Sequence, residues 1–458
     1  MGTSYANVSV GYVEEELFNI FTQKIPTFFL RMLTFVVSFL FLNYNWVVIT
    51  EGLIQLPPRF LNHYKTNDVK ALSIDSTTLN QAVDKAYEKL KQQQLSNSVS
   101  GTREQINALT SFLDGSMIYG SLQNTSDALR TFVNGLLKSY TDSSGNTLLP
   151  QSPNPSEDLC SDPSQDLYCF LAGDDRLNEQ PGLTAIHTVL LRQHNKIAQS
   201  LKELNPCWDD EKLYQESRRF VIAQIQMITY NEFLRVVLGN YYYYLEPRQF
   251  GYTYYYPSIN PSILNEFSAA AFRFGHTLIQ NQFNEINSAG STTSFQLRES
   301  FFKPFGMYIG QLDRILRGLA AQPAQKFDKF IVEDVTNHLF QKPGEEFGLD
   351  LASFNIQRGR DHGIQSYVHY VKEFFNLPIS NFSHLDVLMS STDWTAFENL
   401  YESVEDIDLF SGGVAEYPVT NGVVGPTFAI IIQNQFLKLK YGDKYYFEHW
   451  KQPGSFTY

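Results

Sequence analysis

Runs of lysine and arginine are missing from this chain of 458 residues, whose formal net charge is -13. Proteins that bind nucleic acid usually present a dense basic patch to the phosphates. The sequence offers no such patch, so we expect no nucleic-acid partner. The acidic balance favours solubility and says nothing about the fold.

The motifs of several enzyme classes are also missing. There is no Gly-x-Ser-x-Gly turn to present a serine nucleophile, and no Gly-x-Gly-x-x-Gly or phosphate-binding loop for a nucleotide. No His-Glu-x-x-His pair is present to hold a catalytic zinc ion. These absences count against serine and zinc hydrolases and against nucleotide-dependent enzymes.

Alternating β-type runs are scarce, and we detect no internal repeat. Apolar residues recur at helical spacing from Leu190 to Leu204, where Asn205 and Pro206 should end the helix. A second helical pattern begins near Val221 and runs towards Gly239. Because 43% of the residues are hydrophobic, a sizeable core is possible. We predict a mainly α fold.

The N-terminal part of the chain differs in character from the rest. Behind a cluster of capping residues, helical spacing indicates one amphipathic helix over residues 79–95, and polar residues then form a linker. We therefore predict an N-terminal extension, residues 1–100, followed by the main domain, residues 101–458.

Long apolar runs are limited to one, between residues 25 and 49. Residues 32–49 are just long enough to span a bilayer, with basic residues before them and aromatic residues near the far end. This pattern predicts an uncleaved membrane anchor with the rest of the chain outside. Asn43 and Asn45 interrupt the run, so a buried core helix and an error in the gene model are the alternatives.

Cysteine is scarce, and only Cys160, Cys169 and Cys207 occur. The first two flank a short loop rich in Pro, Ser and Asp and are placed to form a small disulfide, which leaves Cys207 over. Glycosylation sequons begin at Asn7, Asn124 and Asn381. Together these features favour an oxidising, lumenal or extracellular compartment.

Two stretches in the first half of the main domain carry polar groups at close spacing. In residues 109–121, Thr110, Asp114 and Ser116 offer oxygen ligands of the kind that suits Ca²⁺. An ordinary Asp/Gly/Ser turn is the alternative.

Residues 170–180 form the second stretch, in which Arg176 and Glu179 lie three residues apart before a helix. The arginine could polarise a peroxide bond and the glutamate could bind a cofactor. A solvated helix entry is the alternative.

A third stretch, residues 266–280, reads as one apolar helix rich in small residues. Arg273 lies three residues before His276 and so on the same face, and Gly275 leaves room beside the imidazole for a flat cofactor. A lone histidine on an apolar helix is more often a core residue. The functional interpretation of His276 therefore depends on its partners.

The fourth stretch, residues 349–363, crowds Asn355, Arg358, Arg360, Asp361 and His362 together. An imidazole that binds iron needs its second N–H held by an acceptor, and the side-chain oxygen of Asn355 is a candidate. Arginines here could pair with the propionates of a porphyrin. A structural Arg–Asp network is the alternative for the last three residues.

In this order, the four stretches resemble the animal haem peroxidases, and the resemblance runs from about Arg103 to about Trp450. It implies a largely helical domain that binds haem b and uses hydrogen peroxide to oxidise halides or organic donors. Cys160 and Cys169 match a small disulfide of the family.

The resemblance also implies roles for individual residues. His276 matches the axial ligand of the haem iron, Asn355 the residue that orients it, and Arg176 the arginine that assists peroxide cleavage. Glu179 matches a carboxylate that can be esterified to the haem. The remaining matches are arginines near the propionates (Arg273 and Arg358) and the ligands of a calcium ion (Thr110, Asp114 and Ser116 by their side chains and Phe112 by its carbonyl).

One expected element of the family is missing. Its members carry, upstream of the calcium loop, a helix that supplies the distal histidine, a second haem-linked carboxylate and a further calcium ligand. The nearest string here contains His63, but it lacks the neighbouring acid and lies too close to Thr110. We place the loss between about Ser96 and Thr102. Without a general base, peroxide cleavage loses a contribution of roughly 10²- to 10⁴-fold.

Three functions are consistent with these observations. The first is a haem-dependent peroxidase of reduced activity, secreted or membrane-anchored with the peroxidase domain outside. The second is a catalytically inactive haem-binding or adhesive protein. The third is a membrane-anchored structural domain without haem.

Overall fold

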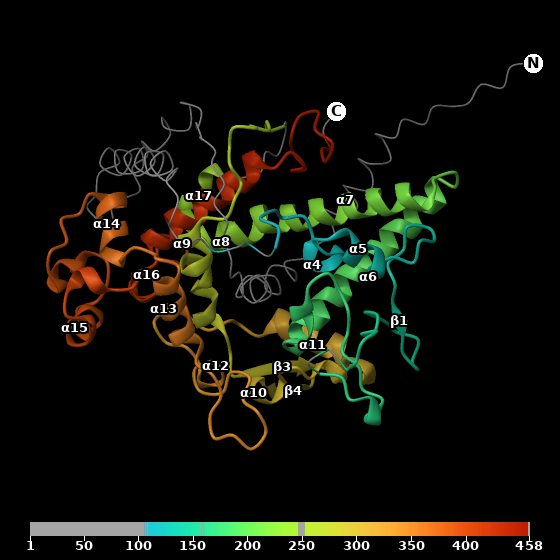
Figure 1. Cartoon of the computed structure of the whole chain (residues 1–458), viewed down its shortest axis with the longest axis horizontal. Helices are drawn as coiled ribbons and strands as arrows, with labels where there is room; N and C mark the ends of the chain where they lie inside the picture. The colour runs from blue at the N-terminus through green and yellow to red at the C-terminus, as the bar shows by residue number, and fades with distance from the viewer. Residues whose placement is uncertain are drawn as a thin grey trace, which may run out of the picture.

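A computed structural model describes residues 105–456, apart from residues 106, 108, 157, 159 and 246–251. Helices dominate this part of the chain, and the strands form only two short hairpins (Figure 1). The prediction of a mainly α fold is therefore confirmed. The predicted anchor at 32–49, the helix at 79–95 and His63 lie outside the described residues.

The helices and strands have the following bounds. The α-helices are α4 (Ser116–Tyr119), α5 (Gln123–Leu129), α6 (Pro181–Leu204), α7 (Asp210–Ile228), α8 (Leu234–Leu238), α9 (Asn265–Ala269), α10 (Leu297–Ser300), α11 (Gln311–Ala321), α12 (Glu333–Thr336), α13 (Leu351–Asp361), α14 (Tyr367–Phe375), α15 (Ser391–Leu400), α16 (Leu409–Ala415) and α17 (Pro426–Gly442). The 3₁₀ segments are η3 (Pro163–Gln165), η4 (Asp175–Asn178), η6 (Gly239–Tyr244), η7 (Ala271–Leu278), η8 (Pro304–Ile309), η9 (Phe382–Val387) and η10 (Val404–Asp406), and η5 (Thr229–Phe233) is a π-helical turn. The antiparallel hairpins pair β1 (Tyr140–Thr141) with β2 (Thr147–Leu148) and β3 (Gln282–Ile286) with β4 (Thr292–Gln296).

Both helices predicted from apolar spacing are present. α6 ends at Leu204, and Asn205 is its C-cap. The second pattern continues through α7, η5 and α8 to Gly239. Gly239 has a φ of 49°, and a Cβ there would lie 2.4 Å from the carbonyl oxygen of Thr420. Backbone conformation and close packing therefore both require glycine at this helix end.

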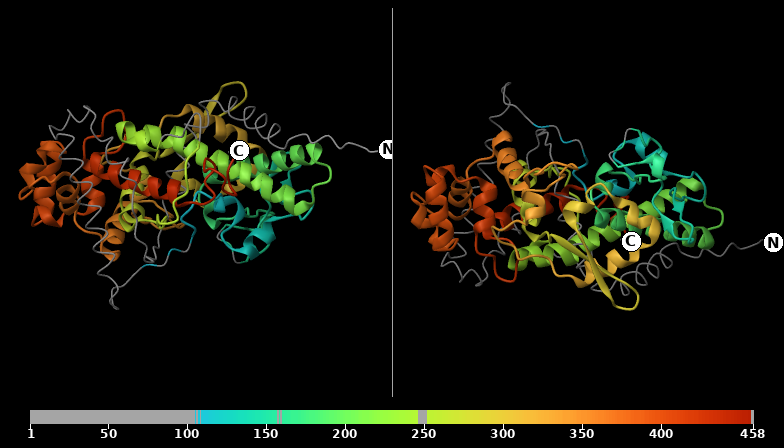
Figure 2. Two further views of the ribbon diagram at one scale, coloured as in Figure 1. Left: turned by 90° about the horizontal axis from the view of Figure 1, so that it is seen from above. Right: turned by 90° about the horizontal axis from the view of Figure 1, so that it is seen from below.

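The hydrophobic core of the described residues consists of two large clusters and a small third one around Ile259 and Tyr441. One large cluster gathers side chains of α8, η7, α14, α16 and α17, and the other gathers those of α6, α7, α11 and β3. The apolar helix α17 packs against α8, α9 and η7, while α6 packs against α7 (Figure 2). His276 and Arg176, which the sequence singles out, lie in segments that belong to different clusters.

Within the part of the chain that the structure describes, none of the helices combines the length and the apolar content that a bilayer crossing requires. The predicted anchor lies outside this part of the chain.

Candidate active site

The segment that carries His276 is broken into two short helices. α9 ends at Ala269, Ala270 has the non-helical angles φ -138° and ψ -69°, and η7 follows as a 3₁₀ helix. The prediction of one continuous α-helix over residues 266–280 is therefore wrong. The Arg273 guanidinium donates a 2.9 Å hydrogen bond from Nε to the carbonyl of Ser268, which supports the break by satisfying that carbonyl. Because a 3₁₀ helix has three residues per turn, Arg273 and His276 still share a face.

His276 is fully buried and belongs to a hydrogen-bonded chain of three side chains. Arg273 donates from Nη1 to Oδ1 of Asn355 over 2.9 Å, and Nδ2 of Asn355 lies 2.6 Å from Nδ1 of His276. The structure thus brings Asn355 together with Arg273 and His276, which lie 82 and 79 residues earlier in the chain. Asn355 is itself fully buried on α13.

The orientation of the Asn355 amide differs from the prediction. We expected its oxygen to face His276, but the nitrogen does so, because the charged Arg273 guanidinium takes the oxygen. An amide nitrogen only donates, so Nδ1 of His276 accepts and the ring proton lies on Nε2. Binding a metal through Nε2 requires the opposite tautomer, which a half-turn of the Asn355 amide would support.

The second ring nitrogen of His276, Nε2, is a buried polar atom without a hydrogen bond to any of the described residues, and it is inaccessible to solvent. Burial, and then the nearby Arg273 charge, lower the pKa of His276 well below its ordinary value, so the imidazole is neutral. A buried polar atom without a partner costs about 1–3 kcal/mol. A neutral imidazole with an unused nitrogen fits an axial metal ligand.

Arg273, which lies beside this imidazole, has a second guanidinium group, that of Arg358, close to it. Arg273 is buried, and its pKa is lowered to about 10, first by burial and then by the charge of Arg358. Arg358 lies three residues after Asn355, on the same helix α13. Positive charge concentrated in this way suits a carboxylate-bearing ligand. The donor set therefore fits a haem with its propionates.

Arg176, a further candidate residue, lies on η4, whose N-cap is Asp174. This carboxylate accepts hydrogen bonds from the backbone N–H of Arg176 over 2.9 Å and from its Nε over 2.8 Å. Asp174 is a site residue that the sequence patterns alone did not single out. An aspartate two residues before an arginine at a helix start is the signal that marks it.

Glu179 follows η4 directly and is buried. Burial raises its pKa to about 7, Arg176 opposes this shift, and Asp174 adds to it. The Asp174 carboxylate thus offsets part of the stabilisation that Arg176 gives to an ionised Glu179. At neutral pH this side chain is able both to accept and to donate a proton.

The predicted calcium loop runs from Thr110 to Ser116. Oγ1 of Thr110 accepts a 3.1 Å hydrogen bond from the backbone of Phe112, and Oδ1 of Asp114 accepts one of 3.0 Å from the backbone of Ser116. Gly115 has a φ of 68°, which closes the turn. The side-chain oxygens of Thr110 and Asp114 therefore stabilise the turns of this loop through hydrogen bonds to its backbone.

The charge of a second carboxylate, Asp443, acts on the loop from Thr110 to Ser116. Burial, and then the charge of Asp114, raise the pKa of Asp443 to about 6, against a hydrogen bond from the backbone of Tyr445. The sequence did not single out Asp443, because it lies more than three hundred residues from the loop and follows α17.

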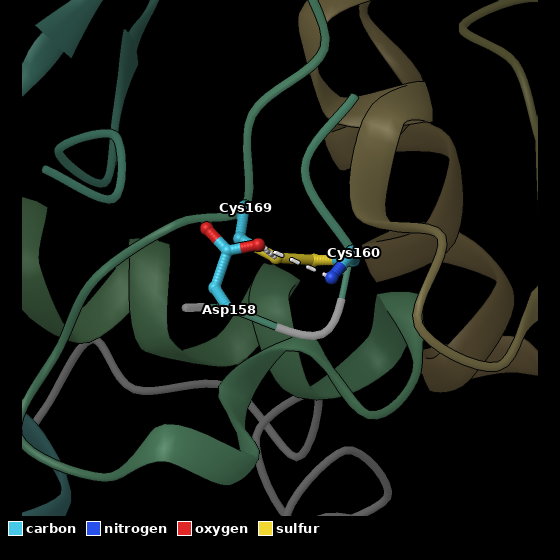
Figure 3. Close-up of side chains that lie close together, drawn as sticks. All are labelled: Asp158, Cys160 and Cys169. Atoms are coloured by element: carbon cyan, nitrogen blue, oxygen red, sulfur yellow. Dashed lines mark hydrogen bonds between the residues drawn. A yellow bond between two sulfur atoms is a disulfide. The ribbon is translucent and has the colours of Figure 1, made fainter. Parts of the chain in front are cut away.

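The disulfide between Cys160 and Cys169 is present, as predicted, and Cys207 is exposed and free. Asp158 lies against this disulfide, and Figure 3 shows its carboxylate beside the sulfur atoms. Within the described residues, Asp158, Cys160 and Cys169 also form a cluster of side chains of the types that bind metal ions.

Comparisons with known proteins identify the class that this fold and site define. The sequence model of the family called animal haem peroxidase matches residues 61–458. Chorion peroxidase from Drosophila melanogaster is 38% identical over 362 residues, which cover 77% of this chain and 44% of that protein. Eosinophil peroxidase from Homo sapiens is 38% identical over 372 residues, covering 78% of this chain and 50% of that protein.

A solved structure agrees with these relatives. Peroxidase A from Dictyostelium discoideum superimposes with a TM-score of 0.67 and 35% sequence identity, covering 76% of this chain and 66% of that one. The chain therefore belongs to the animal haem peroxidase family. It spans about half the length of the two curated relatives described above.

Proposed function

We propose that this chain is a haem-dependent peroxidase that reduces hydrogen peroxide to water while it oxidises an organic donor or a halide. The observation that carries the proposal is the buried His276 imidazole, whose Nε2 has no partner among the described residues and whose Nδ1 contacts Asn355. Membership of the animal haem peroxidase family supports the same conclusion. Haem b, when bound, supplies the iron centre at which peroxide is cleaved.

The residues of this chain hold and orient the haem in this proposal. His276 would bind the iron through Nε2, and Asn355, with its amide turned, would offer its oxygen to Nδ1 and so keep the imidazole basic. Arg273 and Arg358 would supply positive charge to stabilise the propionate carboxylates. Glu179 is the carboxylate available for an ester bond to the haem, since burial keeps it close to its protonated form at neutral pH.

Arg176 is the residue that we assign to peroxide cleavage. Its guanidinium is oriented by Asp174 and can stabilise negative charge on the departing oxygen. A base that moves the peroxide proton is worth roughly 10²- to 10⁴-fold, and the sequence lacks the family's distal histidine. We therefore propose a slow peroxidase rather than a fully active one.

An inactive haem-binding or adhesive protein is the second candidate. The observation that favours it is the ion pair between Arg176 and Asp174, which occupies the arginine that would act on peroxide. The sequence also lacks the distal histidine of the family. Such a protein would bind haem through the same residues and would not turn over.

Reconstitution of the full chain with haemin separates these candidates. We expect a Soret band and slow, peroxide-dependent oxidation of guaiacol or bromide, above the rate of free haemin. A Soret band without turnover would establish the inactive haem protein. Absence of the band would refute both haem-based functions.

We also propose that the loop from Thr110 to Ser116 binds Ca²⁺ through side-chain oxygens and the carbonyl of Phe112. An ion that binds only the folded state stabilises it by an amount that rises with the logarithm of the ion concentration relative to Kd, so a chelator should lower the melting temperature by several degrees. Asp114→Ala should remove this sensitivity, whereas Asp142→Ala, which changes a different Asx turn, should keep it. Identical melting curves with and without chelator would rule out the site.

The compartment that we propose is extracellular, with the peroxidase domain outside the cell whether or not residues 32–49 anchor it. The disulfide supports an oxidising environment, and Asn124 and Asn381 are both exposed. Secreted chains should therefore run faster on a gel after removal of N-linked glycans. Asn124→Gln with Asn381→Gln should reduce that shift, and an unchanged mobility of the wild-type chain after glycosidase treatment would contradict the proposal.

A further inference from the structure

The Cys160–Cys169 disulfide has a carboxylate in contact with one of its two sulfur atoms. Oδ1 of Asp158 lies 3.2 Å from Sγ of Cys169, which is buried, while Cys160 is partly exposed (Figure 3). The two sulfur atoms are therefore inequivalent. A reductant from solvent reaches Cys160 first, and the carboxylate lies beside the other sulfur.

Neighbouring donors hold the Asp158 side chain in its charged form. The backbone of Ser161 donates to Oδ1 over 2.7 Å, the Ser161 hydroxyl donates to Oδ2 over 2.6 Å, and the backbone of Cys160 donates over 3.2 Å. Burial acts to raise the pKa of Asp158, but these bonds and one from Ser152 outweigh it, so the pKa is lowered. A full negative charge thus lies against the sulfur at neutral pH.

We infer that Asp158 protects this disulfide from thiol reductants by opposing the formation of a thiolate on Cys169. In the first step the thiolate of the reductant attacks Sγ of Cys160 and forms a mixed disulfide. The Cys160–Cys169 bond breaks, and its electron pair goes to Sγ of Cys169, which then takes a proton from water. A second thiol of the reductant attacks the mixed disulfide, leaving Cys160 reduced and the reductant oxidised.

The rate of the first step depends on how readily the Cys169 thiolate departs. A thiol of higher pKa leaves more slowly, and a carboxylate in contact raises the pKa of the thiol that forms beside it. At this separation the repulsion between two unit charges corresponds to about a tenfold change in equilibrium even at the dielectric constant of water. Because the leaving sulfur carries only part of this charge in the transition state, the carboxylate should slow reduction by about threefold to tenfold.

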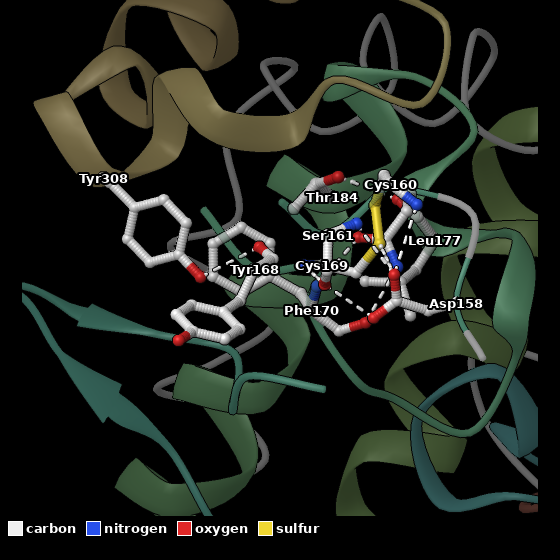
Figure 4. The surroundings of a disulfide bond; sticks show 10 residues. Asp158, Cys160, Ser161, Tyr168, Cys169, Phe170, Leu177, Thr184 and Tyr308 are labelled. Atoms are coloured by element: carbon white, nitrogen blue, oxygen red, sulfur yellow. Dashed lines mark hydrogen bonds between the residues drawn. A yellow bond between two sulfur atoms is a disulfide. The ribbon is translucent and has the colours of Figure 1, made fainter. Parts of the chain in front are cut away.

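The protected bond braces the segment that carries Arg176 and Glu179. Phe170, the residue after Cys169, donates its N–H to the Asn178 side chain over 3.0 Å and accepts a hydrogen bond from it over 2.8 Å. Asn178 is the last residue of η4. Tyr308 stacks on Phe170 at 4.8 Å and donates to the carbonyl of Tyr168 (Figure 4). Slow reduction thus preserves the position of η4, and this inference holds whether or not the chain binds haem.

The test is the rate of reduction of the folded full chain in a Cys207→Ser background, which removes the one free cysteine. Dithiothreitol is added, samples are alkylated, and the reduced fraction is followed by mass spectrometry. We expect Asp158→Asn to accelerate reduction by about threefold to tenfold. The matched control is Asp162→Asn, which removes the same charge from the same loop at a carboxylate bound by Ser164 and Gln165, and it should change the rate by less than about twofold.

Two further arms distinguish a charge effect from a loosened loop and from simple repulsion of the reductant. Ser161→Ala removes hydrogen bonds to Asp158 and Cys169 but keeps the carboxylate, so we expect a much smaller acceleration than in Asp158→Asn. Cationic cysteamine and anionic mercaptoethanesulfonate should both reduce Asp158→Asn faster than the parent chain. Equal acceleration by Ser161→Ala, acceleration confined to the anionic thiol, or no change in Asp158→Asn would overturn the inference.

Discussion

Replacement of His276 with alanine should abolish the Soret band that the full chain develops with haemin. The substitution removes the buried nitrogen that we assign as the ligand of the iron, and the methyl group of alanine cannot bind a metal. Loss of a residue that only orients a metal ligand typically costs 10- to 100-fold in affinity. Loss of the ligand itself should therefore weaken haem binding by more than about 100-fold, as measured by titration of the absorbance.

A matched control for this experiment is available in the same fold. His187 is also buried, with Nδ1 bonded to the carbonyl of Leu183 and Nε2 without a partner among the described residues. The cavity beside it is lined mainly by apolar side chains, including Ile118 and Leu191, and is too small for a porphyrin, while the charges of Asp174 and Arg176 act on the ring. His187→Ala should retain the band. If His187→Ala loses the band and His276→Ala keeps it, our assignment of the iron ligand to His276 is wrong.

Replacement of Lys440 with methionine should destabilise the protein by about 3–5 kcal/mol, the usual cost of removing one partner of a buried ion pair. Lys440 is 1% exposed, lies 3.3 Å from the Glu448 carboxylate and donates to the carbonyl of Leu245 over 3.2 Å. Its ammonium also lies 5.5 Å from the ring centres of Tyr230 and Tyr446. The variant removes this cation from beside the buried Glu448 carboxylate, and urea unfolding measures the loss.

Two controls define what this loss means. Lys212→Met removes an exposed i,i+4 pair with Glu216 and should cost less than about 0.5 kcal/mol. Lys440→Met combined with Glu448→Gln removes both charges and should recover part of the stability. If Lys440→Met costs no more than Lys212→Met, the buried pair does not tie α17 to the C-terminal segment.

Features that depend on local chemistry could be predicted from the sequence. Asn205 and Gly239 mark helix ends because a residue before proline and a glycine of positive φ stop helices wherever they occur. The disulfide followed from two cysteines that flank one short loop. Selection of His276 and Asn355 rested on what an imidazole ligand needs from its partner, and the structure brings the two side chains together.

Features that depend on competition between distant groups could not be predicted. The Asn355 amide faces away from the expected direction because Arg273, a charged donor on another element, takes its oxygen. The break at Ala270 reflects tertiary packing of a short apolar segment against α17, which overrides helix propensity. The contact of Asp158 with Cys169 depends on how the loop closes, and nothing in the spacing of the two residues indicates it.

The 3₁₀ geometry of η7 limits how this part of the protein can vary in length. Each residue of such a helix advances the chain by about a third of a turn. His276 lies three positions after Arg273, so the two side chains are aligned one full turn apart. One inserted or deleted residue would rotate the imidazole by about 120° away from Asn355, whereas a conservative substitution at the intervening Phe274 would leave the alignment intact. The segment should therefore tolerate exchange of side chains but not a change in residue number.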